Sequence, residues 1–80
     1  MYYTYILKSE MSYSHYYGHT SDLITRLKRH NAGKVRSTKA YKPWKLIYSE
    51  KFATKSEAYQ REKFFKSIDG YNFLKEKGII

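Results

Sequence analysis

Five polar side chains stand out because together they could move a proton, stabilise negative charge and bind a cation: Tyr5, Tyr16, Arg26, His30 and Glu62. Each also has an ordinary structural explanation when taken alone. Tyr5 and Tyr16 would be sheet aromatics, and Arg26 would be a solvated cation. His30 would favour the dipole at a helix C-terminus, and Glu62 would pair with Lys66, four residues further on. The elements that carry these residues decide between the two explanations.

The chain before residue 31 predicts a hairpin followed by a short helix. Tyr2–Lys8 is rich in aromatic and β-branched residues and predicts a strand, and His15–Gly18 resumes that pattern after a polar loop. Two strands joined by a short loop pair in antiparallel fashion. We therefore expect Tyr5 and Tyr16 to lie near each other across the hairpin.

A helix is predicted at Leu23–His30, because Thr20-Ser21-Asp22 supplies three good N-cap residues in front of it. Gly33 can adopt a positive φ and so end it. Because Arg26 and His30 are four residues apart, they are neighbours on one face of this helix. The residues predicted to form its apolar stripe are Leu23, Ile24 and Leu27.

The positive charge is concentrated in the middle of the chain. Residues 22–45 hold eight basic residues against one aspartate, so they carry +7 of the formal net charge of +9. Such a field favours a polyanion, although a merely solvated surface is the alternative. Lys34–Pro43 has no apolar periodicity and predicts an exposed basic loop. The candidates for contacts with phosphate oxygens are Lys34, Arg36, Ser37, Thr38, Lys39 and Lys42.

The second half of the chain predicts a strand and two helices. Trp44–Phe52 reads as the third strand, with Trp44, Leu46 and Tyr48 on one face. Thr54 and Glu57 have the spacing of a capping box, and a helix should follow to about Ser67. Asp69-Gly70 would end it, before a last short helix at Tyr71–Lys77. The predicted buried stripe is Ala58, Phe65 and Ile68, with the Glu62 carboxylate among them.

The chain therefore predicts one α+β domain over residues 1–80. Its fold class is a small three-stranded antiparallel sheet flanked by helices, in the order β-β-α-β-α-(α). There is no cysteine, so no disulfide is available to stabilise it. The N-terminus lacks the features of a signal peptide, and no apolar run has the length of a membrane span. We expect a cytoplasmic protein with no membrane partner.

The ordered series of these residues resembles the GIY-YIG nuclease superfamily. It is most similar to the small single-domain bacterial branch, which is related to the N-terminal nuclease domain of the UvrC repair protein. The double-tyrosine motif is short, but the resemblance covers nearly the whole chain. His19 departs from the family pattern, because it stands where an apolar residue is usual. It is either an adventitious substitution or an accessory in proton transfer. The matching segments are Tyr3-Thr4-Tyr5, Tyr16-Tyr17-Gly18, Asp22-Leu23, Arg26-Leu27, His30-Asn31, Lys42-Pro43-Trp44, and Ser56-Glu57-Ala58 leading to Glu62.

The resemblance assigns proton-transfer roles to the hairpin and the first helix. Tyr5 would be the general base or would orient the attacking water. Tyr16 would support it and contact the phosphate, and His30 would assist in proton transfer or hold Tyr5. A tyrosine has an ordinary pKa of about 10, so we expect neighbouring groups to lower the pKa of Tyr5. Gly18 would have a structural role, letting the strand close under the site.

The resemblance also implies a metal-dependent phosphodiester hydrolase. Arg26 would stabilise charge on the scissile phosphate, and Glu62 would hold a single Mg²⁺, with Mn²⁺ as a substitute. One carboxylate is sufficient, because Mg²⁺ keeps most of its waters in such sites. The lack of an acidic cluster is therefore no objection.

The expected function is an endonuclease acting on DNA, structure-selective and linked to repair or recombination. RNA is a further candidate substrate, and the chain would be a monomer or a weak homo-oligomer with room for a protein partner. The alternative is a non-catalytic nucleic-acid-binding module, or adaptor, that keeps the fold. Metal-dependent cleavage that is lost in Glu62→Ala would distinguish the two.

Overall fold

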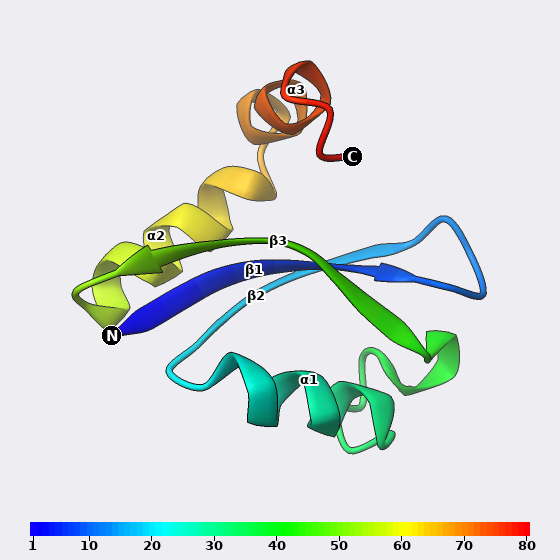
Figure 1. Cartoon of the computed structure of the whole chain (residues 1–80). Coiled ribbons are helices and arrows are strands. Elements are labelled where there is room, and N and C mark those ends of the chain that lie inside the picture. The colour runs from blue at the N-terminus through cyan, green and yellow to red at the C-terminus, as the bar shows by residue number, and fades with distance from the viewer.

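A three-stranded antiparallel sheet lies between helices on its two faces (Figure 1). The computed structural model describes residues 1–80. The strand order is β2-β1-β3, so the first strand is central. The helix α1 covers one face, while α2 and α3 lie on the other. The predicted fold class and element order are confirmed. The element bounds are β1 Tyr2–Ser9, β2 His15–Thr20, α1 Leu23–Asn31, β3 Trp44–Phe52, α2 Lys55–Phe65 and α3 Ile68–Glu76.

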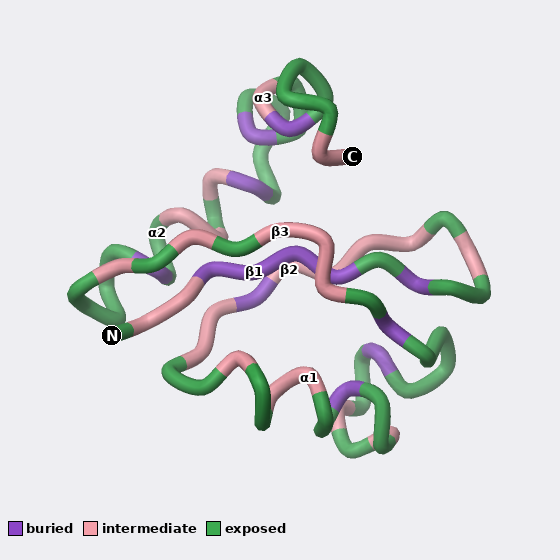
Figure 2. Tube along the Cα trace, viewed as in Figure 1, coloured by how far each residue is buried: buried purple, intermediate pink, exposed green.

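The central strand β1 is buried on both of its faces (Figure 2). Tyr5 and Leu7 pack towards α1 together with Trp44. Ile6 alternates to the other face and packs with Phe65 of α2 and a buried leucine of α3. The protein thus has two small apolar clusters, one on each side of a single sheet.

A bulge changes which residues of β3 share a face. The register pairs Ile6 with Tyr48 and Leu7 with Leu46, so Ile47 is the extra residue on β3. Leu46 packs against the α1 side, whereas Tyr48 packs against the cluster beneath α2. The prediction that Leu46 and Tyr48 share a face is therefore wrong. Strict alternation fails wherever one residue is inserted into the ladder.

The first helix is capped as predicted, but its apolar stripe is narrower. Asp22 accepts a hydrogen bond from the backbone N–H of Thr25, and Gly33 has a φ of 75° just beyond the helix. Leu23 and Leu27 pack against the core. Ile24 is 71% exposed, so its predicted place in the stripe is wrong. It lies one residue after Leu23, a rotation of about 100° around the helix axis.

The last two helices divide at Ser67 rather than at Asp69-Gly70. Thr54 and Glu57 form the predicted capping box of α2, and Ser67 caps α3. Gly70 lies inside α3, where a Cβ atom would come within 1.8 Å of the Phe64 carbonyl oxygen. This glycine permits a close approach of the two helices instead of ending one. The predicted burial of Ile68 is also wrong, because it is exposed at the start of α3.

No helix of this structure has both the length and the apolar character needed to cross a membrane.

Candidate active site

Tyr5 lies at the centre of the site, on β1 opposite Gly18 of β2. Its side chain is almost completely buried, and its ring centroid lies 6.2 Å from that of Tyr16 and 5.9 Å from that of His30. A Cβ atom at position 18 would lie 2.5 Å from the Tyr5 hydroxyl oxygen. Gly18 therefore leaves the space that the hydroxyl occupies beside the edge strand.

The helix α1 brings two nitrogen donors or acceptors to the Tyr5 hydroxyl. His30 Nε2 lies 3.0 Å from the hydroxyl oxygen, and Arg26 Nε donates to it at 3.3 Å. His30 is fully buried, whereas Arg26 is partly exposed. The predicted neighbours on one helix face thus converge on a single oxygen atom.

Both ionisable rings are held in their neutral forms. Burial raises the pKa of Tyr5 to about 12, against the opposing effect of the hydrogen bond from Arg26. Burial also lowers the pKa of His30 to about 4, and the charges of Arg26 and Arg29 lower it further. The expectation that neighbouring groups lower the pKa of Tyr5 is wrong for the protein alone. The increase in the pKa of Tyr5 caused by burial is larger than the decrease caused by Arg26.

The Thr38 hydroxyl is the hydrogen-bond partner of the second ring nitrogen of His30, Nδ1. The hydroxyl oxygen lies 2.8 Å from His30 Nδ1 and 3.3 Å from the carbonyl oxygen of Val35. The Val35 carbonyl oxygen also accepts from the backbone N–H groups of Thr38 and Lys39, so the hydrogen bonds fit either neutral tautomer of His30. In the tautomer in which Thr38 accepts from Nδ1–H, the Nε2 lone pair is left to accept the proton of Tyr5. In this neutral tautomer, His30 is ready to receive that proton.

Thr38 is thus a buried positioning residue and not a phosphate contact. Its side chain is completely inaccessible to solvent. The prediction that its hydroxyl meets phosphate is wrong, because the loop folds back and places it under α1. The indole Nε1–H of Trp44 donates to the Thr38 carbonyl oxygen at 2.8 Å, which ties this part of the loop to β3.

Thr38→Val should lower the free energy of unfolding by about 1–3 kcal/mol, because it leaves the buried Nδ1 of His30 without a hydrogen-bond partner. Valine has nearly the same shape, so little of the loss comes from a cavity. Thr38→Ser keeps the hydroxyl and should cost about 1 kcal/mol for the lost methyl group. Urea unfolding of the three proteins tests this. Equal losses in the two variants would show that the hydroxyl has no special role.

Stability should fall as the pH is lowered from about 6.5 to about 4. In the unfolded chain His30 binds a proton near its ordinary pKa of 6.5, whereas in the folded protein it stays neutral down to about 4. The unfolded state binds more protons in this window, so acid favours it, by at most about 3 kcal/mol in total. Urea unfolding at pH 7 and pH 5 measures the slope. His30→Gln should flatten it, and an unchanged slope in that variant would contradict the assignment.

Glu62 reaches the site from α2 through His19 of β2. Its Oε1 lies 2.7 Å from His19 Nδ1, and its Oε2 accepts from Lys66 Nζ at 2.7 Å. Burial raises the pKa of Glu62, but the bonds from His19 and Lys66 outweigh it and hold the pKa below its ordinary value. Glu62 is therefore a carboxylate at neutral pH. Its charge also helps to keep Tyr5 protonated.

An open recess of about 490 Å³ joins the two halves of the site. Arg26, which contacts Tyr5, and His19, which contacts Glu62, both line it. Lys55 from the start of α2 adds a second cation. The recess is lined mainly by polar groups, so it presents positive charge and hydrogen-bond donors to an incoming anion.

The donor set suits a hard divalent cation bound through one carboxylate. No group of three or more His, Cys, Asp or Glu side chains is gathered anywhere in the protein. A carboxylate offers about four lone-pair positions, and His19 and Lys66 occupy two of those of Glu62. The remaining positions fit a Mg²⁺ ion that keeps most of its waters. Glu62 is the residue that would hold it.

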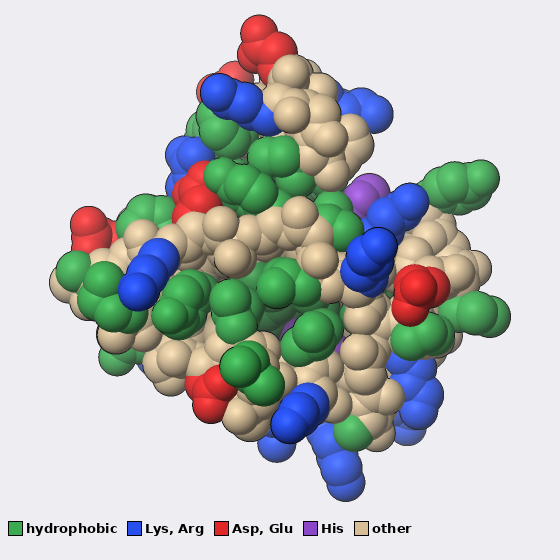
Figure 3. Space-filling view, viewed as in Figure 1, with side chains coloured by type: hydrophobic (Ala, Val, Ile, Leu, Met, Phe, Trp, Pro, Cys, Tyr) green, Lys and Arg blue, Asp and Glu red, His purple; other side chains and the backbone are tan.

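The other predicted phosphate contacts are exposed and lie in a loop beside α1. A short 3₁₀ helix at Lys39–Tyr41 interrupts this loop, which sequence did not predict. Basic side chains gather over this part of the molecule, on the lower side of Figure 3. The exposed residues of the predicted set are Lys34, Arg36, Ser37, Lys39 and Lys42.

Two residues have hydrogen-bond partners that were not predicted from sequence. The sequence left His19 as an adventitious substitution or a proton-transfer accessory, and it pairs with Glu62 across 43 positions of the chain. Thr38 was assigned to the phosphate-binding set. For His19 a weak signal existed, because alternation places it on the face opposite Tyr16 and Gly18, towards α2. For Thr38 no periodic signal existed, since the loop has none.

Comparison with known proteins defines the class. The model of the family described as the GIY-YIG catalytic domain matches residues 1–72, and the chain belongs to this family. Among curated proteins, a UPF0213 protein of Listeria monocytogenes (strain F2365) is 44% identical over 69 residues, which are 85% of this chain and 76% of that protein. The UPF0213 protein YazA of Bacillus subtilis is 48% identical over 56 residues. The match spans 69% of this chain and only 57% of that relative.

A solved structure agrees with this placement. The solution NMR structure of the UPF0213 protein BH0048 from Bacillus halodurans superposes with a TM-score of 0.55 at 32% sequence identity. The superposition covers 94% of this chain and 82% of that protein. The chain is therefore a small GIY-YIG domain similar to UPF0213 proteins. The family implies a nuclease-type domain and a nucleic acid substrate.

Proposed function

We propose that this protein is a divalent-metal-dependent endonuclease that hydrolyses phosphodiester bonds in DNA. The observation that carries the proposal is that Arg26 and His30 both contact the Tyr5 hydroxyl. Arg26 also lines a recess, and the same recess is lined by His19, which is bonded to Glu62. This combination supplies a proton pathway, a cation for the phosphate and a carboxylate for a metal, which phosphodiester hydrolysis needs. We further propose that it acts in repair or recombination on DNA of particular structure.

Tyr5 works as a proton relay and not as a preformed tyrosinate. With a pKa of about 12 for Tyr5 and about 4 for His30, both are neutral near pH 7. The hydroxyl oxygen accepts the proton of the attacking water while its own proton passes to His30 Nε2, 3.0 Å away. In the tautomer in which Thr38 accepts from Nδ1–H, that nitrogen is unprotonated beforehand. The substrate phosphate adds negative charge, which favours the imidazolium that forms.

The Arg26 guanidinium has two alternative partners, the Tyr5 hydroxyl in the free protein and the phosphate of a bound substrate. In the free protein its Nε donates to the Tyr5 oxygen at the long distance of 3.3 Å, and its side chain lines the recess. A phosphate in the recess attracts the guanidinium, which matches phosphate oxygens in a bidentate manner. That movement also frees a lone pair on Tyr5 for the proton of water. Tyr16, packed against the rings of both Tyr5 and His30, holds the relay in place.

Glu62 would hold the Mg²⁺ ion, with Mn²⁺ as a substitute. When bound, the metal supplies Lewis-acid stabilisation of charge on the phosphate and leaving oxygen. His19 orients the carboxylate by its bond to Oε1. Lys66 neutralises the other oxygen and is 53% exposed, so it can turn into solvent when a cation arrives.

The test is a cleavage panel with purified protein on duplex, nicked, branched and single-stranded DNA, and on RNA, with Mg²⁺, Mn²⁺ or EDTA. The proposal expects metal-dependent nicking of at least one DNA. Salt-sensitive DNA binding without cleavage of any substrate would instead establish a non-catalytic binding module.

A further inference from the structure

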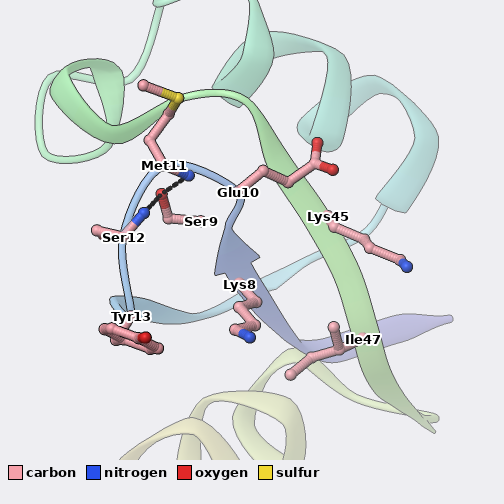
Figure 4. Close-up of a pocket in the computed structure, with 8 residues that line it drawn as sticks. All are labelled: Lys8, Ser9, Glu10, Met11, Ser12, Tyr13, Lys45 and Ile47. Carbon is pink, nitrogen blue, oxygen red and sulfur yellow. Dashed lines mark hydrogen bonds between the residues drawn. The ribbon is translucent and has the colours of Figure 1, made fainter.

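The far end of the β1–β2 hairpin carries a second surface, separate from the recess at Arg26. Two adjoining hollows of about 600 and 460 Å³ share Lys8 and Tyr13 in their walls. Figure 4 shows Lys8 and Tyr13 lying near each other below the loop, with Lys45 further along β3. We call this the hairpin-end surface. Its residues that matter here are Lys8, Tyr13, His15, Lys45, Tyr71 and Lys75.

The loop that presents Tyr13 is held by its own hydrogen bonds. The buried Ser9 hydroxyl accepts from the backbone N–H groups of Met11 and Ser12 and donates to the Tyr41 carbonyl oxygen. The Ser12 hydroxyl accepts from the N–H of Ser14. Tyr13 itself is 90% exposed. Its ring is offered to a partner from an ordered loop, at little cost in conformational entropy on binding.

The lysines of this surface form no ion pair, although the Glu10 carboxylate lines the same hollow as Lys8 and Lys45. None of Lys8, Lys45 and Lys75 belongs to any of the three ion pairs in the protein. His15 lies opposite Lys8 on the neighbouring strand and lines the same hollow as Lys8 and Lys75. Burial first, and then the charges of these two lysines, lower the pKa of His15. The Lys75 ammonium lies 5.8 Å from the centroid of the Tyr71 ring, which is itself half exposed. The surface therefore combines lysines that belong to no ion pair with two exposed tyrosine rings.

We propose that the hairpin-end surface binds an unpaired nucleic acid strand, with bases stacked on Tyr13 and Tyr71 and phosphates on the lysines. Exposed aromatic rings set among cations are the combination by which proteins hold single strands. A duplex keeps its bases stacked internally and would leave these rings unused. An acidic protein or a lipid surface would use the charge but would gain nothing specific from two separated rings.

The position of the surface extends the proposed function, on which this inference rests. His15 precedes Tyr16 on β2 and points to the opposite face of the sheet. The hairpin end also joins the basic loop, because the Glu10 N–H donates to the Pro43 carbonyl oxygen at 3.0 Å. A substrate reaches both sites if an unpaired strand extends away from its scissile bond, along the basic loop and around the hairpin end. The predicted preference is for frayed, flapped or branched DNA.

The experiment measures binding by fluorescence anisotropy in EDTA, so that no cleavage is required. Wild type, Tyr13→Ala and Tyr13→Phe are titrated against a labelled oligothymidine, a blunt duplex and polyphosphate. Tyr13→Ala should weaken oligothymidine binding about tenfold, the loss typical of one stacked base. Tyr13→Phe keeps the ring and should bind as wild type does. Duplex and polyphosphate affinities should be the same for all three proteins, since neither ligand uses the ring.

The proposal is overturned if Tyr13→Ala binds oligothymidine as wild type does, if Tyr13→Phe is weakened as much as Tyr13→Ala, or if polyphosphate or duplex binding falls in parallel. Folding does not confuse the result, because Tyr13 is almost fully exposed and supports no core contact. Failure of the proposed nuclease function shows separately, as the absence of cleavage in Mg²⁺ with single-strand binding intact.

Discussion

Glu62→Gln should reduce metal-dependent cleavage by about 10²–10³, the cost typical of removing one charge-stabilising element. Glutamine has the same shape and keeps an oxygen and a nitrogen where the two carboxylate oxygens meet His19 and Lys66 at 2.7 Å. The substitution removes the negative charge that would hold the cation and replaces one acceptor oxygen by an NH₂ group, from which His19 can accept in its other neutral tautomer. The expected result is a folded protein that binds DNA and cuts poorly at every metal concentration.

The stability of the Glu62→Gln protein should change little. Lys66 is more than half exposed, so its ion pair with Glu62 contributes no more than about 1 kcal/mol. The rate loss can therefore be measured on a fully folded variant.

The matched control for Glu62 is Glu50→Gln. Glu50 is another half-buried, ion-paired glutamate, bonded to Arg61 Nε at 2.7 Å and to the Tyr48 hydroxyl. Removing the Glu50 charge should lower the free energy of unfolding, and it should leave the rate of cleavage by the folded protein unchanged. If Glu62→Gln cuts at the wild-type rate with an unchanged Mg²⁺ dependence, Glu62 is not the metal ligand.

Tyr5→Phe should lower the cleavage rate by about 10²–10⁴, which is the usual contribution of a positioned proton-transfer group. The substitution removes one oxygen and keeps the buried ring. That oxygen is the only atom in the site that touches both His30 and Arg26. DNA affinity should be nearly unchanged, because the hydroxyl is buried and acts on the proton rather than on the phosphate.

The cost to stability is separate from the cost to the rate. Without the hydroxyl, the buried Nε2 of His30 loses its hydrogen-bond partner, which should lower the free energy of unfolding by about 1–3 kcal/mol. Tyr48→Phe is the control, since it removes a hydroxyl from the same sheet that bonds only to Glu50. It should retain full cleavage. A Tyr5→Phe protein that cuts within a few-fold of wild type would eliminate the relay through Tyr5 and His30.

Local patterns in the sequence were sufficient for the elements and for the proximity of several candidate residues. Alternation in β1 predicts which residues face α1, and the caps at Asp22 and Thr54 predict where two helices begin. The four-residue spacing of Arg26 and His30 predicts that they act together. These features depend on backbone periodicity and on short-range hydrogen bonds, which a few neighbouring residues determine.

Local patterns predicted the faces of β3 and the end of α2 wrongly, because both depend on contacts between elements. The bulge at Ile47 shifts the faces of β3, and Gly70 lies within a helix because Phe64 approaches it closely. Neither feature has a local signature, since each arises where two elements meet. The class of fold was unaffected, because it depends on the order of the elements and not on their boundaries.

What the sequence alone determined is the inventory of the site: two tyrosines, an arginine, a histidine and a distant carboxylate, in a family-like order within a basic chain. Tertiary structure decided how they connect. It buried Thr38 against His30, joined His19 to Glu62, and raised the pKa of Tyr5 to about 12. Burial and long-range pairing depend on how segments far apart in the chain dock, and periodicity carries no information about that docking. The contact of the Tyr5 hydroxyl with both His30 and Arg26 therefore became visible only in the folded protein.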